Sequence, residues 1–230
     1  MLMLLSLVLL VLCGFRAYPR FRQRAAVKQW YKTLNLRQHE DRYHELFKHV
    51  DGFSLSRQAR VAYDAIEYTY GEIEFPSFIA LLSLAKPDSK TIFYDLGSGT
   101  GRAVFACAMV FGVQKSCGIE LLSPLSLSAL KQQQHLQQWH DYSEQSQALY
   151  FINADFLTVD FTDATLIFIN ATAFFGDTWD AIHQALKQVK AGTTIITTSK
   201  KLNSNGFMII RKTWVAMSWG PVSAYIHQRI

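Results

Sequence analysis

The chain has 230 residues, of which 50% are hydrophobic and 18% charged, and its formal net charge is +5. This composition excludes a largely disordered chain, and the length suits one α/β domain with a complete hydrophobic core. Residues 1–60 hold 11 Lys/Arg against 4 Asp/Glu, whereas residues 61–230 hold 12 against 14. A nucleic-acid enzyme is expected to carry its basic patch on the catalytic domain. The distribution therefore argues against nucleic acid and for a membrane surface as a partner.

The three cysteines, Cys13, Cys107 and Cys117, have neither the spacing of metal ligands nor an even-numbered disulfide framework. Cys107 and Cys117 stand in apolar surroundings and are expected to be small core residues. No metal site is predicted, and a reducing compartment is expected.

The N-terminal stretch MLMLLSLVLLVLCGF has 15 residues without a charge and is followed by a cluster of basic residues. Three interpretations compete: a cleaved signal peptide, a lipoprotein signal at Cys13, and an uncleaved anchor. The first lacks a basic leading region and a clear cleavage site, and the second lacks a small residue before the cysteine. We expect residues 1–15 to be a membrane anchor, with the basic cluster holding the rest of the chain in the cytoplasm.

Helices are predicted over residues 25–48, over about 55–70, and from about 77 to the helix-breaking Pro87. Short apolar strands then alternate with helices, which argues for a parallel sheet covered on both faces. The last two strands have no helix between them and must form an antiparallel hairpin. The predicted strands are 91–95, 115–120, 149–153, 164–169, 193–198, about 207–217 and about 221–229, and the helices between them are 101–111, 124–140 and 177–190.

A doubly wound sheet that ends in an antiparallel hairpin differs from a plain dinucleotide-binding fold. It is typical of class I S-adenosylmethionine-dependent methyltransferases. The predicted fold class is therefore α/β: a seven-stranded, doubly wound, Rossmann-like sheet with a C-terminal antiparallel hairpin and N-terminal helices.

The stretch DLGSGTG, residues 95–101, lies between a predicted strand and helix. It matches neither the G-x-G-x-x-G dinucleotide fingerprint nor a phosphate loop ending in Gly-Lys-Ser/Thr. A carboxylate at Asp95 would repel a pyrophosphate but attract a methionyl sulfonium and its amino group. We therefore predict an S-adenosylmethionine site here, with Gly97, Gly99 and Gly101 allowing close backbone approach. The alternative is a tight turn in which Asp95 caps the helix.

Acidic residues also follow the next two strands. Glu120 ends the second strand, where a carboxylate accepts hydrogen bonds from ribose hydroxyls; the alternative is an exposed carboxylate. After the third strand, Asp155 suits the adenine amino group and Phe156 suits the adenine ring. The alternative there is a turn aspartate beside an ordinary core phenylalanine.

The fourth strand ends at Asn170, in the stretch FINATAFF, at the edge that would face a transferable methyl group. A carboxamide and an aromatic ring such as Phe174 can hold an amine there, and the ring favours a cationic product. The alternative is that Asn170 caps the next helix while Phe174 belongs to the core.

Seven motifs occur in the order and approximate spacing of one family: YGE (70–72), DLGSGTG (95–101), CGIE (117–120), ADFL (154–157), FINATAF (168–174), TSK (198–200) and SWGPVSAYIH (218–227). Over residues 60–230 the chain resembles the disruptor-of-telomeric-silencing (Dot-one-like) histone lysine methyltransferases. The expected domain order is a hydrophobic membrane anchor (1–15), a basic helical linker (16–50) and a methyltransferase domain (51–230), and the resemblance concerns the last of these.

The resemblance also implies roles for individual residues. Asn170 and Phe174 are the expected catalytic residues, lining the lysine channel where it meets the methyl group. The expected contacts of S-adenosyl-L-methionine are Tyr70, Asp95, Gly97, Gly99, Gly101, Glu120, Asp155, Phe156 and Asn170.

The sequence departs from the family on the substrate side. Ile73 replaces a threonine after YGE, Ala171 replaces the second of two paired asparagines, and Ala224 replaces a channel tyrosine, with Tyr225 next to it. The family's basic nucleosome-binding extension is absent from the sequence.

The leading hypothesis is a membrane-anchored protein lysine N-methyltransferase with its catalytic domain in the cytoplasm. The alternatives are a methyltransferase for a small molecule or lipid, and a non-catalytic scaffold that binds S-adenosylmethionine. Nucleic acid is not expected as a partner of the catalytic domain. The sequence indicates neither the acceptor nor the oligomeric state.

Overall fold

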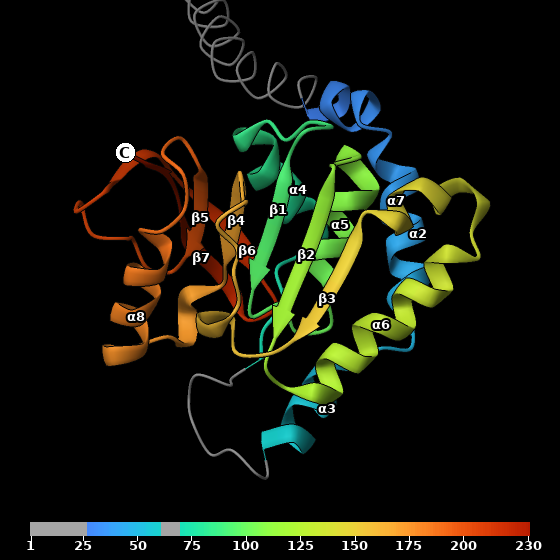
Figure 1. The fold of residues 1–230 in the computed structure, drawn as a ribbon. Coiled ribbons are helices and arrows are strands. Elements are labelled where there is room, and N and C mark those ends of the chain that lie inside the picture. Colours follow the sequence, from blue (N-terminus) through green and yellow to red (C-terminus); the bar gives the residue numbers. More distant parts are fainter. Residues whose placement is uncertain (1–26, 61–69) are drawn as a thin grey trace, which may run out of the picture. The chain divides into compact units, whose positions relative to one another are not determined.

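The computed structural model describes residues 27–60 and 70–230 (Figure 1). Two compact units divide the chain, Met1–Arg42 and Tyr43–Ile230, and the boundary falls within helix α2 (Leu36–Phe47). In the first unit, residues 27–33 are also helical. The predicted cavity residues and all seven strands belong to the second unit.

Two helices precede the sheet in the second unit. Helix α3 (Gly52–Ala59) starts at a side-chain cap, because the Asp51 carboxylate accepts a hydrogen bond from the Ser54 amide at 3.0 Å. The sequence predicts a helix over about 55–70, and both of these limits are wrong. The helix starts earlier, at Gly52, because of this cap, and Tyr70 is not helical. Residues 61–69 lie outside the described ranges.

Helix α4 (Phe75–Ala85) begins with a proline in its first turn and ends before Pro87, as the sequence predicts. Lys86 follows it with a φ of 54°, the left-handed conformation in which many helices end. Four of its apolar side chains are almost completely buried against the rest of the domain: Phe78, Ile79, Leu81 and Leu82.

The sheet has seven strands in the order β3-β2-β1-β4-β5-β7-β6. The first five strands along the chain pair in parallel, whereas β7 pairs antiparallel with both β5 and β6. This confirms the predicted doubly wound sheet with a C-terminal hairpin. The strands are β1 (Ile92–Leu96), β2 (Lys115–Glu120), β3 (Leu149–Asn153), β4 (Leu166–Ile169), β5 (Thr194–Thr198), β6 (Phe207–Met217) and β7 (Gly220–Arg229).

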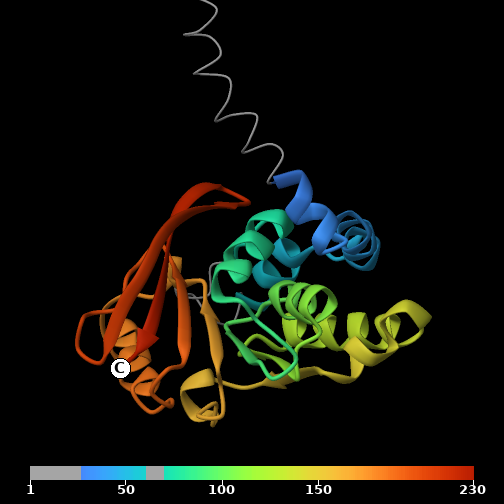
Figure 2. The ribbon, with the colours of Figure 1, turned by 90° about the horizontal axis from the view of Figure 1, so that it is seen from above.

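Helices cover both faces of the sheet (Figure 2). On one face Phe78 of α4 packs against Phe93 and Phe168, with ring centroids 6.4 and 5.0 Å away. On the other, Ile182 and Leu186 lie in a buried cluster with the alternate residues of the strands. The remaining helices are α5 (Arg102–Phe111), α6 (Ser123–Gln137), α7 (Ser143–Gln147) and α8 (Gly176–Leu186), and α7 was not predicted.

Two buried histidines hold the connection between β5 and β6. The Nε2 atom of His227 accepts a hydrogen bond from the Leu202 amide at 3.1 Å, and Nε2 of His183 accepts one from the Asn203 amide at 3.0 Å. An imidazole nitrogen can accept only when it is not protonated. The acceptor nitrogens of the two rings therefore help to fix the path of this connection.

Across residues 27–60 and 70–230, no helix is long and apolar enough to cross a membrane. The anchor expected at residues 1–15 lies outside the described ranges.

Replacing His227 by Gln should remove part of the pH dependence of the free energy of unfolding. Burial lowers the pKa of His227 to about 4 in the fold, against about 6.5 in an unfolded chain. The neutral ring therefore stabilises the fold fully above about pH 6.5, and this contribution is lost as the pH falls towards 4. Between pH 7.5 and 5, the wild type should lose about 2 kcal/mol more than His227→Gln. Urea unfolding of both proteins at the two pH values measures the difference, and equal losses would contradict the prediction.

Candidate functional site

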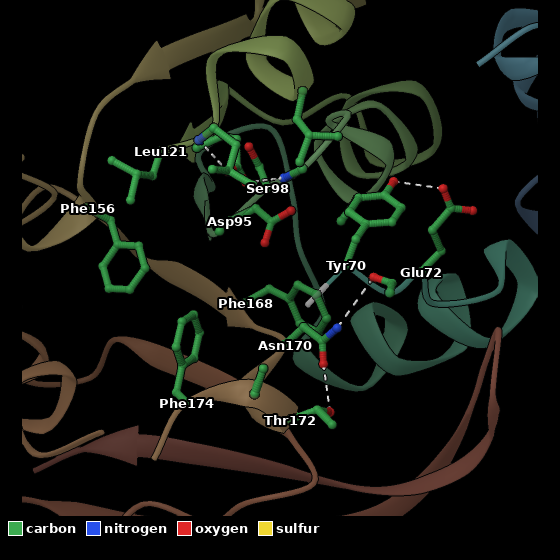
Figure 3. A pocket seen from close by; sticks show the side chains of 18 of the residues that line it. Tyr70, Glu72, Asp95, Ser98, Leu121, Phe156, Phe168, Asn170, Thr172 and Phe174 are labelled. Carbon is green, nitrogen blue, oxygen red and sulfur yellow. Dashed lines mark hydrogen bonds between the residues drawn. The ribbon is translucent and has the colours of Figure 1, made fainter. Parts of the chain in front are cut away.

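A cavity of about 530 Å³ lies at the carboxyl ends of β1, β2 and β4 (Figure 3). Each of these strands contributes a polar residue at or directly after its end: Asp95, Glu120 and Asn170. The strand order reverses between the neighbouring strands β1 and β4, because the chain returns from β3 at one edge to place β4 on the other side of β1. Doubly wound sheets bind their ligands at this kind of switch point. The cavity is therefore the candidate site.

The structure brings nearly all the predicted site residues together at this cavity. Its lining includes Tyr70, Asp95, Gly97, Gly99, Glu120, Asp155, Phe156, Asn170 and Phe174. Gly101 is the exception: it is the last glycine of the loop and faces the Phe151 ring instead of the cavity.

The glycine loop needs its glycines for conformation and for space. Gly97, Gly99 and Gly101 have φ values of 85°, 56° and 81°, in the left-handed region that other residues rarely adopt. A Cβ atom on Gly99 would lie 2.5 Å from the Tyr70 ring, and one on Gly101 would lie 2.6 Å from the Phe151 ring. Gly101 thus serves the packing of the loop rather than the cavity itself.

Glu120 fastens this loop to the end of β2. One carboxylate oxygen accepts a hydrogen bond from the Gly99 amide at 2.7 Å, and the other accepts one from the Leu122 amide at 2.8 Å. Burial raises the pKa of Glu120 above its usual value. Because a carboxylate offers about four acceptor sites, Glu120 keeps acceptor capacity at the cavity that it lines. Because Glu120 is only 8% exposed, the interpretation as an exposed carboxylate is wrong.

Asp95 is a buried carboxylate whose charge no described residue compensates. Its side chain accepts no hydrogen bond from any residue in the ranges 27–60 and 70–230, and helix α5 begins at Gly101 without an Asp95 cap. Burial, and then the charge of Glu120, raise the pKa of Asp95 well above its usual range. The hydroxyl oxygen of Ser98, which also lines the cavity, is buried and has no partner among the described residues. The Ser98 hydroxyl faces β2, where a Cβ atom on Gly118 would lie 2.6 Å from it, so Asp95 is the group that a positively charged ligand can reach.

Tyr70 belongs to a buried polar network on the opposite side of the cavity from Phe156 and Phe174 (Figure 3). Its hydroxyl donates to Glu72 at 2.7 Å and lies 2.9 Å from the Thr100 hydroxyl. Glu72 also pairs with Arg102 of α5, with a 2.7 Å separation between Oε1 and Nε. This network ties the segment before α4 to the first turn of α5. It therefore fixes the Tyr70 wall of the cavity.

Asn170 is held by three hydrogen bonds. Its oxygen accepts from the hydroxyls of Thr172 at 3.0 Å and Thr198 at 2.7 Å, and its nitrogen donates to the Gly71 carbonyl at 3.5 Å. The side chain does not cap the following 3₁₀ turn, so the capping interpretation is wrong. Because both oxygen lone pairs are used, an N–H is what the carboxamide still offers to the cavity.

Phe156 and Phe174 form the apolar wall of the cavity, with ring centroids 5.7 Å apart in an edge-to-face arrangement. Asp155 caps the short 3₁₀ helix that carries Phe156, accepting from the Leu157 amide at 2.9 Å. Its turn role is therefore present, and it also lines the cavity with its remaining acceptor capacity.

The comparisons with known proteins agree with this geometry. A family model described as "Histone methylation protein DOT1" matches residues 57–217.

The chain belongs to the DOT1 family. A relative from Caenorhabditis elegans, named "Histone-lysine N-methyltransferase, H3 lysine-79 specific", is 34% identical over 145 residues, which are 60% of this chain. The chain spans only about 15% of that protein's length.

Two solved structures share the fold. One is an RNA methyltransferase from Salinibacter ruber in complex with S-adenosyl-L-homocysteine, with a TM-score of 0.55, 22% identity, and coverage of 67% of this chain and 90% of that chain. The other is a SAM-dependent methyltransferase from Thiobacillus denitrificans in complex with S-adenosyl-L-homocysteine, with a TM-score of 0.53, 10% identity, and coverage of 75% and 96%. At these identities they establish the class I methyltransferase fold.

The DOT1-family motif TSK, residues 198–200, has a function in the site that the sequence did not reveal. Thr198 donates to Asn170, and the Lys200 ammonium donates to the Phe174 carbonyl and lies 3.2 Å from the centroid of the Phe175 ring. Between them, Ser199 adopts a φ of 63° and its hydroxyl lies 2.8 Å from that of Thr172. The end of β5 therefore positions both residues of the predicted acceptor side. The only feature of the sequence that pointed to these residues was the family motif TSK itself.

The motif SWGPVSAYIH also supplies a lining residue that was not predicted. Trp219 lines the cavity, is 46% exposed, and packs so closely that a Cβ atom on Gly71 would lie 1.9 Å from its ring. Ala224 is buried in the pairing of β7 with β5, and Tyr225 does not line the cavity. The position of the family's channel tyrosine is therefore not refilled by Tyr225.

Replacing Glu120 by Ala should lower the free energy of unfolding by about 2–4 kcal/mol in the absence of any ligand, because two buried amides lose their acceptor. Glu120→Gln keeps one acceptor oxygen and should cost about half as much. Urea unfolding measures both values, with the exposed Glu144→Ala as the matched control. A Glu120→Ala protein as stable as the control would show that Glu120 does not fasten the loop.

Proposed function

We propose that this protein is an S-adenosylmethionine-dependent N-methyltransferase that acts on a lysine side chain of a protein. One observation carries the proposal: an uncompensated buried carboxylate, Asp95, and an aromatic wall share one cavity at the switch point of a methyltransferase fold. The family membership and the identity to a histone-lysine methyltransferase support the choice of lysine.

The cavity residues fit S-adenosylmethionine. Asp95, with Gly97, would hold the positively charged methionyl end, which would compensate the buried carboxylate. The remaining acceptor capacity of the Glu120 carboxylate would accept the ribose hydroxyls. Asp155 and Phe156 would hold the adenine. The cavity volume of about 530 Å³ lies in the range of sites for molecules of this size.

The free N–H of Asn170 refines the role expected from the sequence. With its oxygen occupied by two hydroxyls, Asn170 is a hydrogen-bond donor, which suits a methionyl carboxylate better than the hydrogens of an attacking amine. Thr172 and Thr198 keep this donor in one orientation. Asn170 then acts by fixing the position of the methionyl end.

When bound, S-adenosylmethionine supplies a methyl group on a positively charged sulfur. The attacking lysine amine must be neutral, and its deprotonation costs roughly 4–5 kcal/mol at neutral pH from a pKa of about 10.4. An apolar surrounding such as Phe168, Phe174 and Met217 lowers the pKa of a buried lysine and offsets much of that cost. No histidine, lysine or cysteine of the described ranges lines the cavity. Positioning and exclusion of water are therefore the proposed sources of catalysis.

The substrate side differs from the family pattern, so the acceptor protein is proposed only by class. Ile73 is buried and bridges to Met217, and Ala171 and Ala224 are completely buried. These small or apolar residues leave the acceptor opening lined by Trp219 and Phe174. A small molecule or lipid as acceptor is the outcome to test against protein. Incubating the protein with labelled S-adenosylmethionine and whole membranes shows whether the label enters protein or lipid.

We also propose that residues 1–15 anchor the protein in a membrane and that the catalytic domain faces the cytoplasm. The support is the uncharged sequence of these residues and the basic residues that follow it.

Asn170→Ala should reduce methyl transfer by about a hundredfold or more, because near-attack geometry is sensitive to displacements of about 1 Å. Binding of S-adenosylhomocysteine, measured by calorimetry, should weaken much less. Asn170→Asp keeps the acceptor for both threonine hydroxyls but sets an oxygen against the Gly71 carbonyl in place of the N–H, so it should lose turnover like Asn170→Ala and also some stability. Full turnover of Asn170→Asp on any labelled acceptor would show that the N–H is not needed.

Deleting residues 1–15 should move the protein from the membrane to the soluble fraction while calorimetry finds the same affinity for S-adenosylhomocysteine. The expected reason is loss of the uncharged apolar segment, while the predicted cofactor residues all lie at or beyond Tyr70. A full-length protein that stays soluble without detergent would refute the anchor.

A further inference from the structure

Charge in the second unit is strongly polarised along the chain. Residues 61–180 contain 5 Lys/Arg and 14 Asp/Glu, whereas residues 181–230 contain 7 Lys/Arg and neither Asp nor Glu. The near-neutral balance of the domain therefore conceals a basic C-terminal part. This part forms β5, β6 and β7, at one end of the sheet (Figures 1 and 2).

The outermost strand of this basic part exposes an unusual combination of side chains. Met208, Ile209 and Ile210 are 48%, 44% and 49% exposed, and Trp214 is 67% exposed. Arg211 and Lys212, which stand between them in the sequence, are exposed as well, and because side chains of a strand alternate in direction, the exposed run occupies both sides of the sheet edge. We call residues 208–214 the β6 surface. An exposed run of large apolar side chains on a sheet edge marks an interaction site.

Two features of the edge strand β6 disfavour pairing with a further strand. The register with β7 shifts between Ile209 and Arg211, which is a β-bulge, and two charges follow at once. Bulges and charges are the features with which proteins block strand addition. Further along, Glu74 donates to Ala216 and Ser218 donates to Glu72, so the end of β6 is already covered. The β6 surface therefore suits a partner that does not add a strand.

The side chains favour a lipid surface over a nucleic acid. Cations next to a membrane are attracted to anionic lipid headgroups, and tryptophan is enriched at the level of the headgroups. The three aliphatic side chains gain free energy by leaving water for the acyl boundary but gain nothing from a phosphate backbone. We propose that the β6 surface docks the domain on an anionic phospholipid bilayer, through Arg211 and Lys212 at the headgroups and through Trp214 and the aliphatic side chains at the interface.

This contact uses neither residues 1–15 nor the methyl acceptor, and it orients a domain that is already held at the membrane rather than holding it there by itself. It lies on the catalytic domain itself, and β6 leads at its other end to Met217, which lines the cavity. Docking through β6 would therefore set the orientation of the cavity relative to the bilayer.

The test uses the full-length protein and vesicles of phosphatidylcholine with about 30% phosphatidylserine and brominated acyl chains. Because residues 1–15 could bind the vesicles by themselves, the readout must be local. Bromine quenches tryptophan fluorescence at short range, so Trp214→Phe should remove most of the quenching. Arg211→Gln/Lys212→Gln should weaken the contact by about 30-fold, at roughly fivefold for each cation, and should abolish the part of the quenching that depends on Trp214. The matched control is Lys90→Gln/Lys131→Gln, which removes two exposed cations elsewhere and should change nothing.

Several outcomes would overturn the proposal. Equal quenching of the wild type and Trp214→Phe would show that β6 does not reach the bilayer. Equal Trp214-dependent quenching by vesicles of phosphatidylcholine alone would show that anionic lipid is not recognised. Binding of duplex DNA that is lost in Arg211→Gln/Lys212→Gln, with no Trp214-dependent quenching by vesicles, would assign the surface to nucleic acid instead.

Discussion

The site depends on the pair of hydrogen bonds from the Glu120 carboxylate to the amides of Gly99 and Leu122. A loop with three left-handed glycines loses much conformational freedom on folding, and it needs a fixed partner. Glu120 supplies that partner from the neighbouring strand. Burial, and then the charge of the same Glu120 carboxylate, raise the pKa of Asp95, so Glu120 both shapes the loop and adds to the demand for a positive ligand. Glu120 therefore both stabilises the conformation of the loop and belongs to the proposed cofactor site.

The acceptor side is organised from a different strand. Thr198 and Lys200, at the end of β5, hold Asn170 and the Phe174 carbonyl, while His227 and His183 hold the connection that follows. The two sides of the cavity are thus fastened independently, one by β2 and one by β5. Changes on the acceptor side, such as Ala171 and Ala224, can therefore alter the opening without disturbing the loop. This separation accounts for a family motif that is complete at the cofactor end and altered at the other.

The charge distribution connects the fold to its proposed surroundings. The end of the sheet formed by β1–β3 belongs to the acidic part of the chain, and the hairpin end is basic and exposes aliphatic side chains. The domain as a whole is nearly neutral because the acidic residues before 181 balance the basic residues after it. Orientation at a charged surface follows from such a dipolar arrangement more readily than from total charge.

Local patterns in the sequence determined the order of strands and helices, the closing hairpin, the glycine loop and the acidic residues at strand ends. These features follow from hydrophobic period and from turn chemistry, both of which act between residues close in the chain. The tertiary structure decided which partners those residues meet. The contacts that shape the site join residues that lie 21 to 148 positions apart in the chain. They are the contacts of Glu120 with Gly99, Thr198 with Asn170, Lys200 with Phe174 and Trp219 with Gly71. No local period encodes such contacts, because they arise only when parallel strands place their carboxyl ends at one edge of the sheet.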